Sequence, residues 1–192
     1  MGKYQEVEVK YLLCNKEQVL ENINQMGLKR NIENQIQNDS YYIPAHRNFF
    51  ESEIVSEWLR IRETEINCTL NFKQWLPIGA KEQNYCNEYE TVVEDVFALK
   101  KIFELLNFKE VVRVYKVRNS WIYDDVEICI DEVSNLGTYI ELEMLHKVDK
   151  GQISLMQERF DMILQYIAAD VGERNRRGYP YMLLEKSKSE ER

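Results

Sequence analysis

Charged side chains of like sign recur at a spacing of two residues in several short segments of the sequence. Glu6 and Glu8 stand just before Lys10, and Arg60 and Arg62 repeat the spacing with basic residues. Because side chains alternate between the two sides of a β-strand, residues two apart share one face. Further pairs are Glu88 and Glu90, Lys116 and Arg118, and Glu141 and Glu143, and Glu127 and Asp131 share a face with Cys129.

These rows of charge suit a ligand that carries both a metal ion and phosphate groups. Carboxylate oxygens bind hard divalent cations, and Arg and Lys bind phosphate oxygens. Rows of like charge repel unless a group of opposite sign binds between them. The ordinary alternative is that each row is the water-facing side of a half-buried strand, which is common for any single pair. The recurrence on several strands favours a metal-bound polyphosphate.

The elements that must position these rows follow from residue periodicity. Apolar residues at helical spacing predict helices between Asn15 and Gly27, over 94–107 and 153–170, and a short one near Tyr179 to Lys186. Alternating polar and apolar residues predict strands over 4–13, 35–43, 55–64, 66–75, 85–93, 110–122, 125–133 and 138–146. This order of hairpins with helices between them predicts an α+β fold on a large antiparallel sheet. A closed or strongly curved sheet would turn the charged faces inward and leave the apolar faces for the helices.

Bulk properties limit the classes of function. The 192 residues are predicted to form one domain over 1–192, and a net charge of −8 argues against a general nucleic-acid binder. No apolar run is long enough to span a bilayer, and no signal-peptide core is present, so a cytoplasmic protein without membrane partners is expected. The four cysteines form no CxxC pair and there are only two histidines, which argues against a zinc site or a disulfide framework.

An ordered series of motifs then suggests a family. The segment Glu6-Val7-Glu8-Val9-Lys10 resembles the ExExK signature of the CYTH superfamily, the triphosphate tunnel metalloenzymes. Similar family motifs follow in order at residues 37–42 (QxDxYY), 59–62 (LRxR), 72–73 (FK), 88–90 (ExE), 116–118 (KxR) and 131–143 (DxV…LGxFxExE).

The resemblance implies a closed eight-stranded antiparallel β-barrel, the triphosphate tunnel, with flanking helices. It implies Mg²⁺ or Mn²⁺ bound by Glu6, Glu8, Glu141 and Glu143. The phosphates would be held by Lys10, Arg60, Arg62, Lys73, Lys116 and Arg118, and the catalytic groups would be Glu90, Asp131 and Lys10. Arg113 is out of phase with the KxR strand and takes no role, and Lys186 is a candidate for the basic residue that some members place near the C-terminus.

Several reactions fit such a site. The favoured one is hydrolysis of the terminal phosphate of inorganic triphosphate or of an organic triphosphate such as thiamine triphosphate. The alternative is a class IV adenylyl cyclase that converts ATP to cyclic AMP and pyrophosphate, and the loop over 43–58 resembles that of members grouped with such cyclases. Hydrolysis is favoured because it needs no adenine pocket. A non-catalytic nucleotide- or polyphosphate-binding module and a homodimer are left open, and a small barrel for an apolar ligand is disfavoured by the charged rows.

Overall fold

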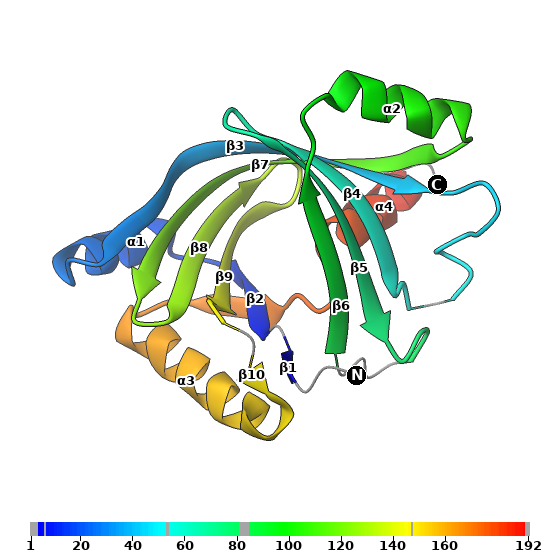
Figure 1. The fold of residues 1–192 in the computed structure, drawn as a ribbon. Coiled ribbons are helices and arrows are strands. Elements are labelled where there is room, and N and C mark those ends of the chain that lie inside the picture. The colour runs from blue at the N-terminus through cyan, green and yellow to red at the C-terminus, as the bar shows by residue number, and fades with distance from the viewer. Residues whose placement is uncertain (1–3, 6, 53, 81–84, 147, 191–192) are drawn as a thin grey trace. The chain divides into compact units, whose positions relative to one another are not determined.

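The computed structural model describes residues 4–5, 7–52, 54–80, 85–146 and 148–190 (Figure 1). Its helices are α1 (Lys16–Gln25), α2 (Val96–Leu105), α3 (Ile153–Tyr166) and α4 (Tyr179–Glu190), with a short 3-10 turn η1 (Lys150–Gln152). Its strands are β1 (Tyr4–Gln5), β2 (Glu8–Leu13), β3 (Lys29–Ile43), β4 (Glu57–Glu63), β5 (Cys68–Leu76), β6 (Tyr85–Val92), β7 (Lys109–Tyr123), β8 (Val126–Val133), β9 (Gly137–Met144), β10 (Val148–Asp149) and β11 (Val171–Arg174).

The prediction of a closed eight-stranded barrel is wrong. Nine strands form one open sheet in the order β11-β2-β9-β8-β7-β3-β4-β5-β6, and β1 pairs separately with β10. Closure would require the two end strands of this order, β11 and β6, to pair with each other. The described order instead ends at β11, which pairs antiparallel with β2 and places Val171 opposite Leu13. The sequence reading missed β11 because four residues are too few for a clear alternation.

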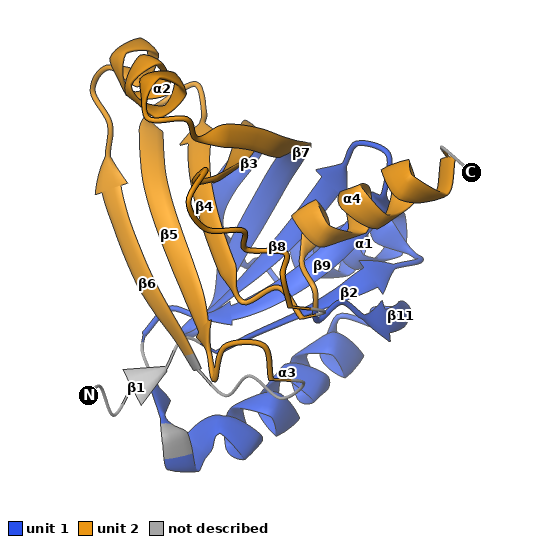
Figure 2. Cartoon of the chain, turned by 90° about the vertical axis from the view of Figure 1, so that its right-hand side faces the viewer, with its two compact units in different colours: residues 1–35, 117–176 blue, residues 36–116, 177–192 orange. Residues whose placement is uncertain are grey.

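The chain divides into two compact units, shown in different colours in Figure 2. Unit 1 contains residues 1–35 and 117–176, and unit 2 contains residues 36–116 and 177–192. The long strands β3 and β7, each of 15 residues, contribute to both. The single domain over 1–192 stays a prediction.

The core of unit 1 forms between the apolar face of its strands and two helices. On β2 the odd-numbered Val9 and Leu13 are buried, whereas Glu8 and Lys10 point to the opposite face. Val19 and Ile23 of α1 and residues of α3 such as Phe160 join the same cluster. Each such side chain contributes about 1.5–3 kcal/mol when fully buried. This packing confirms the predicted division of β2 into an apolar and a charged face.

The core of unit 2 is smaller and is built around α2. Phe103 packs edge-on against Tyr42 and stacks on Phe108, with ring centroids 5.1 and 4.6 Å away. Ile61 of β4 is fully buried in this cluster, which leaves Arg60 and Arg62 on the other face of the strand. The side chain of Asp95 accepts a hydrogen bond from the Ala98 amide at 2.8 Å and so caps α2.

Element boundaries differ from the predicted ones in two informative places. Strand β3 begins at Lys29, six residues before the predicted start, and α3 ends at Tyr166 rather than near residue 170. Asn15 occupies the N-cap position of α1 as predicted, but its side chain makes no capping bond. It donates to the Ala168 carbonyl and accepts from the Asp170 amide, both at 2.8 Å. Among the described helices, none has both the length and the apolar character needed to cross a membrane.

Candidate functional site

The register of unit 1 places the charged residues of three strands side by side. Glu8 lies opposite Glu143, and Lys10 lies opposite Glu141, in the β2–β9 pair. In the β8–β9 pair Glu143 and Glu141 face Glu127 and Cys129. Residues directly opposite in an antiparallel pair point to the same face, so these side chains form one polar surface.

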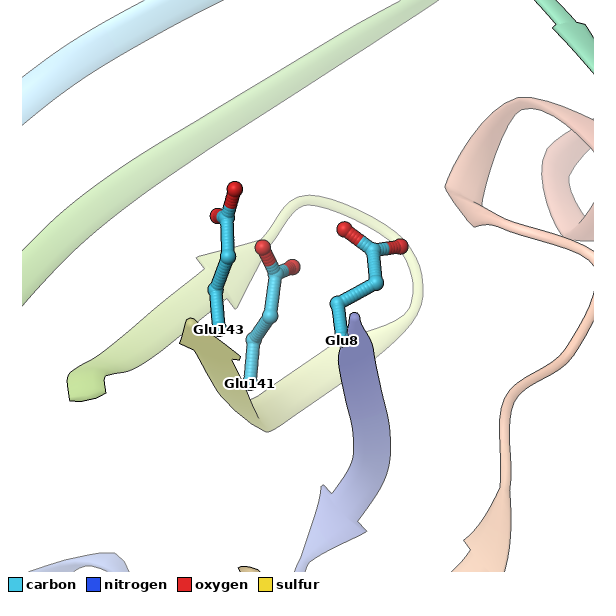
Figure 3. Close-up of side chains that lie close together, drawn as sticks. All are labelled: Glu8, Glu141 and Glu143. Carbon is cyan, nitrogen blue, oxygen red and sulfur yellow. The ribbon is translucent and has the colours of Figure 1, made fainter. Parts of the chain in front are cut away.

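Three carboxylates on this surface converge (Figure 3). Oxygens of Glu8, Glu141 and Glu143 all lie within 4.8 Å of one another, and Glu141 is buried while the other two are half-buried. Divalent cations bind carboxylate oxygens at about 2.0–2.6 Å, so oxygens around one ion lie at most about 5 Å apart. The spacing and the all-oxygen donor set therefore fit Mg²⁺ or Mn²⁺. Glu6, the fourth predicted ligand, lies outside the described residues.

Two cations flank these carboxylates. Lys10 Nζ lies 2.8 Å from Glu141 Oε2, and Arg118 Nη2 lies 3.2 Å from the same oxygen. Arg118 also binds both oxygens of the fully buried Asp131, at 2.6 and 2.7 Å. Burial favours the neutral form of Lys10, but the charges of Glu141, Glu8 and Asp131 outweigh it and raise its pKa. Lys10 therefore carries its proton at neutral pH.

The pKa of Arg118 is likewise set by burial acting against neighbouring negative charges. Burial opposes its charge, whereas the carboxylates of Asp131 and Glu141 hold its pKa well above the usual value. Burial raises the pKa of the Cys129 thiol, which therefore stays neutral. Cys129 is a buried free cysteine.

Glu127 shares the polar surface but is held in place by neighbours. Ser120 Oγ and Asn31 Nδ2 both donate to its Oε1, at 2.6 and 2.7 Å. Glu127 does not belong to the cluster of converging carboxylates, which is Glu8, Glu141 and Glu143. The sequence reading assigned no role to Ser120 or Asn31, because single polar residues carry no signal without knowledge of the register.

Unit 2 contains a second ionic network, centred on Asp39 of β3. Arg62 Nε and Nη2 bind the two Asp39 oxygens at 2.7 Å each, and Arg60 Nη1 lies 3.8 Å from Oδ2. Asp39 is only 2% exposed, and burial would favour its neutral form. The charges of Arg62, Arg60 and Lys116 prevail and lower its pKa. Although Asp39 lies in a predicted motif, the sequence reading gave it no role.

The carboxylates of β6 pair with basic residues of neighbouring strands. Arg60 Nη2 lies 3.4 Å from Glu90 Oε2, and Lys73 Nζ lies 3.3 Å from Glu88 Oε1. Asn71 Nδ2 donates to Glu88 at 2.7 Å and to Glu90 at 3.1 Å. Part of the repulsion expected within each row of like charge is thus relieved inside the protein.

The remaining basic residues have distinct surroundings within unit 2. Lys116 is 2% exposed, and its Nζ lies 5.3 Å from the centre of the Tyr179 ring. Arg113 is exposed and pairs with Glu110 at 2.8 Å, in keeping with its outward phase. Lys186 lies on the exposed part of α4.

The structure thus gathers the predicted site residues into two sets. The set in unit 1 is Glu8, Lys10, Arg118, Asp131, Glu141 and Glu143. The set in unit 2 is Arg60, Arg62, Lys73, Glu90 and Lys116.

The match to known proteins covers nearly the whole chain. Residues 4–174 match the model of the CYTH domain. A relative from Methanocaldococcus jannaschii, named "Putative adenylate cyclase MJ0240", is 35% identical over 138 residues, which are 72% of this chain and 75% of the relative. The PH1819 protein of Pyrococcus horikoshii OT3 has a similar structure, with a TM-score of 0.76 and 30% identity over 94% of this chain and 99% of that one.

A more distant structure supports the fold alone. The structure of a protein from Vibrio parahaemolyticus, described as "a putative adenylate cyclase", has a TM-score of 0.76 at 19% identity, and the match covers 95% of this chain and 99% of that one. The chain belongs to the CYTH-domain family of triphosphate-processing enzymes.

Proposed function

We propose that this protein is a divalent-metal-dependent hydrolase that removes the terminal phosphate of inorganic triphosphate or of an organic triphosphate such as thiamine triphosphate. The observation that carries the proposal is the convergence of Glu8, Glu141 and Glu143 within 4.8 Å, beside the paired cations Lys10 and Arg118. Phosphoryl transfer depends mainly on positioning and on neutralising charge, and this surface supplies donors for both.

The three carboxylates would hold Mg²⁺ or Mn²⁺. Such an ion would supply neutralisation of phosphate charge and would lower the pKa of a water molecule bound to it. Lys10 and Arg118 would donate hydrogen bonds to phosphate oxygens next to these carboxylates. Asp131 accepts two bonds from one edge of the Arg118 guanidinium and so fixes the plane in which the other N–H groups point.

The basic residues of unit 2 are proposed as further phosphate ligands. Arg62 is oriented by Asp39 in the same bidentate way as Arg118 by Asp131. Arg60 and Lys73 are held by longer contacts, at 3.4 and 3.3 Å, to exposed carboxylates. Contacts of this length to exposed groups contribute little stability, and Arg60 also lies 3.8 Å from the buried Asp39.

Of the two carboxylates predicted as general base, Glu90 suits the role better. Both oxygens of Asp131 are bonded to Arg118, and Asp131 is fully buried. The Glu90 side chain is 48% exposed, so it can accept a proton from water. In the proposed step the water oxygen bonds to the terminal phosphorus, Glu90 takes the proton, and the bond to the bridging oxygen breaks. Its electron pair leaves with the diphosphate.

Adenylate cyclisation is the second candidate, and the name of the Methanocaldococcus relative at 35% identity favours it. The nucleophile would be the ribose 3′-hydroxyl of ATP, and pyrophosphate would leave. Such a reaction needs a surface that holds adenine. The Trp58 ring contacts the rings of Tyr41 and Phe50, with centroids 5.5 and 6.0 Å away, as expected of packing. Hydrolysis requires no such surface and is therefore preferred.

A product assay tests the proposal. Purified protein is incubated with Mg²⁺ or Mn²⁺ and, separately, with inorganic triphosphate, thiamine triphosphate and ATP, and the products are separated by chromatography. Orthophosphate with a diphosphate product supports hydrolysis and identifies the substrate. Formation of cyclic AMP and pyrophosphate from ATP would contradict hydrolysis and support the adenylyl cyclase. Tight triphosphate binding without any product would make the protein a binding module.

A further inference from the structure

Burial along the C-terminal helix α4 is greatest at its first two residues and lower over residues 181–184, which are half-buried. Tyr179 and Pro180 are buried, whereas α4 from residue 185 onward is exposed. The preceding Gly178 has a φ of 77°, a conformation that glycine adopts without strain, and proline suits the first turn of a helix. The local sequence Gly-Tyr-Pro therefore fixes where the Tyr179 ring lies.

The Tyr179 ring contacts a buried cation. Lys116 Nζ lies 5.3 Å from the ring centroid, and the two residues are 2% and 5% exposed. An ammonium group within about 6 Å of an aromatic centroid is attracted to the ring, most strongly when water is excluded. Lys116 also lies near enough to Asp39 to help lower the pKa of that carboxyl. Its charge is thus held between an aromatic face and the Asp39–Arg62 pair.

We propose that Tyr179 is a positioning residue for Lys116, and that through this contact the start of α4 sets the affinity of unit 2 for the phosphate chain of the substrate. The proposal rests on the proposed function, because it takes Lys116 as a phosphate ligand. A lysine side chain has four rotatable bonds and loses much conformational freedom when held in one place. The Tyr179 ring holds Lys116 in place before the substrate arrives, so that less of this cost falls on binding.

The structure offers a matched control on the same helix. Tyr181 also lies against a cation, with Arg177 Cζ 5.0 Å from its ring centroid, but Arg177 also pairs with Glu185 in an exposed contact at 3.0 Å. Replacing Tyr181 removes an equivalent contact from α4 without reaching Lys116. Tyr179→Phe keeps the aromatic face and removes only the hydroxyl group, and Tyr179→Leu removes the ring.

A double-mutant cycle on full-length protein tests the proposal, with dissociation constants for inorganic tripolyphosphate measured by calorimetry in EDTA to prevent turnover. Thermal unfolding of each variant checks the fold. We expect Tyr179→Leu to weaken binding roughly ten-fold, whereas Tyr179→Phe and Tyr181→Leu stay within about two-fold of the unsubstituted protein. Lys116→Met should weaken binding at least as much as Tyr179→Leu. In the Lys116→Met background, Tyr179→Leu should have no further effect.

Two results would overturn the positioning role. In the first, Tyr179→Leu leaves the affinity unchanged or weakens it equally in the presence and absence of Lys116. In the second, Lys116→Met leaves the affinity unchanged although the unsubstituted protein binds tripolyphosphate. Failure of the proposed hydrolysis is distinct, because the unsubstituted protein would then form no product from any triphosphate, even where it binds tripolyphosphate.

Discussion

Arg118 of β7 and Asp131 of the neighbouring strand β8 form a bidentate ion pair, with nitrogen–oxygen distances of 2.6 and 2.7 Å. Asp131 has no solvent exposure. A buried pair of this kind contributes little net stability compared with apolar residues of similar volume, but it is costly to break. Burial of this pair is therefore weak evidence for a stabilising role, and the pair lies beside three converging carboxylates.

Breaking this pair should destabilise the protein strongly. Asp131→Asn leaves the buried Arg118 charge without a full counter-charge, and we expect the free energy of unfolding in urea to fall by about 3–5 kcal/mol. Glu104→Gln is the control, because the Glu104–Lys101 pair is exposed on α2. That substitution should change the free energy by less than about 1 kcal/mol. Equal effects of the two substitutions would show that Asp131 is accessible to water.

The cluster of Glu8, Glu141 and Glu143 predicts that only substitutions within it weaken metal binding. Glu8→Gln and Glu143→Gln each remove one negative oxygen donor and should weaken Mn²⁺ binding by about ten-fold or more, as measured by calorimetry. Glu127→Gln is matched to Glu143→Gln, since the two residues lie directly opposite each other, but Ser120 and Asn31 hold Glu127. The Mn²⁺ affinity of Glu127→Gln should stay within about three-fold of that of the unsubstituted protein. A comparable loss in all three variants would argue against a defined site.

The lowered pKa of Asp39 predicts that its contribution to the free energy of unfolding is lost at acidic pH. Its folded-state pKa is lowered, so its ionised form stabilises the fold above the unfolded-state pKa of about 3.9, and this contribution is lost as the pH falls through the lower folded-state value. The difference in unfolding free energy between the unsubstituted protein and Asp39→Asn should be constant from pH 7 to about pH 5 and shrink below about pH 4. A difference that stays constant down to the acid-unfolding limit would show that the pKa of Asp39 is not lowered.

Asn15 predicts a result that a simple helix cap would not give. Its side chain joins the start of α1 to residues 168 and 170, which follow α3. Asn15→Ala should lower the unfolding free energy by about 1–3 kcal/mol, since two hydrogen bonds are lost. Serine is a good N-cap residue but has no amide to bond both backbone groups. Asn15→Ser should therefore be nearly as unstable as Asn15→Ala in thermal and urea unfolding. If Asn15→Ser were as stable as the unsubstituted protein, the two hydrogen bonds of the Asn15 amide could not be its contribution to stability.

The sequence predicted local structure well where one face of an element is apolar. Residues of β2 alternate so clearly that the strand and its buried face follow from periodicity. The elements α2 and β8 were also predicted, but only Phe103 of α2 is buried, and β8 buries residues on both of its faces. The closed barrel was an extrapolation from family resemblance and is wrong, because closure depends on which edge strands pair. The short strand β11 that occupies the edge of β2 carries little periodic signal.

The candidate site was predictable in its residue types but not in its pairings. The spacing of Glu141 and Glu143 predicted a shared face, and their oxygens do lie together with those of Glu8. The Asp39–Arg62 and Arg118–Asp131 pairs could not be predicted from spacing. They depend on the register between strands and on side-chain direction, which are set by tertiary packing.

The central claim is that the carboxylates of unit 1 support metal-dependent triphosphate processing. Phosphorus NMR of inorganic triphosphate, followed over time with Mg²⁺ or Mn²⁺, tests it most directly. We predict that orthophosphate and diphosphate signals appear with the unsubstituted protein, vanish on addition of EDTA, and are absent for Glu143→Gln, although that variant unfolds at a similar temperature. Undiminished turnover of triphosphate by Glu143→Gln, or by the unsubstituted protein in EDTA, would contradict the account.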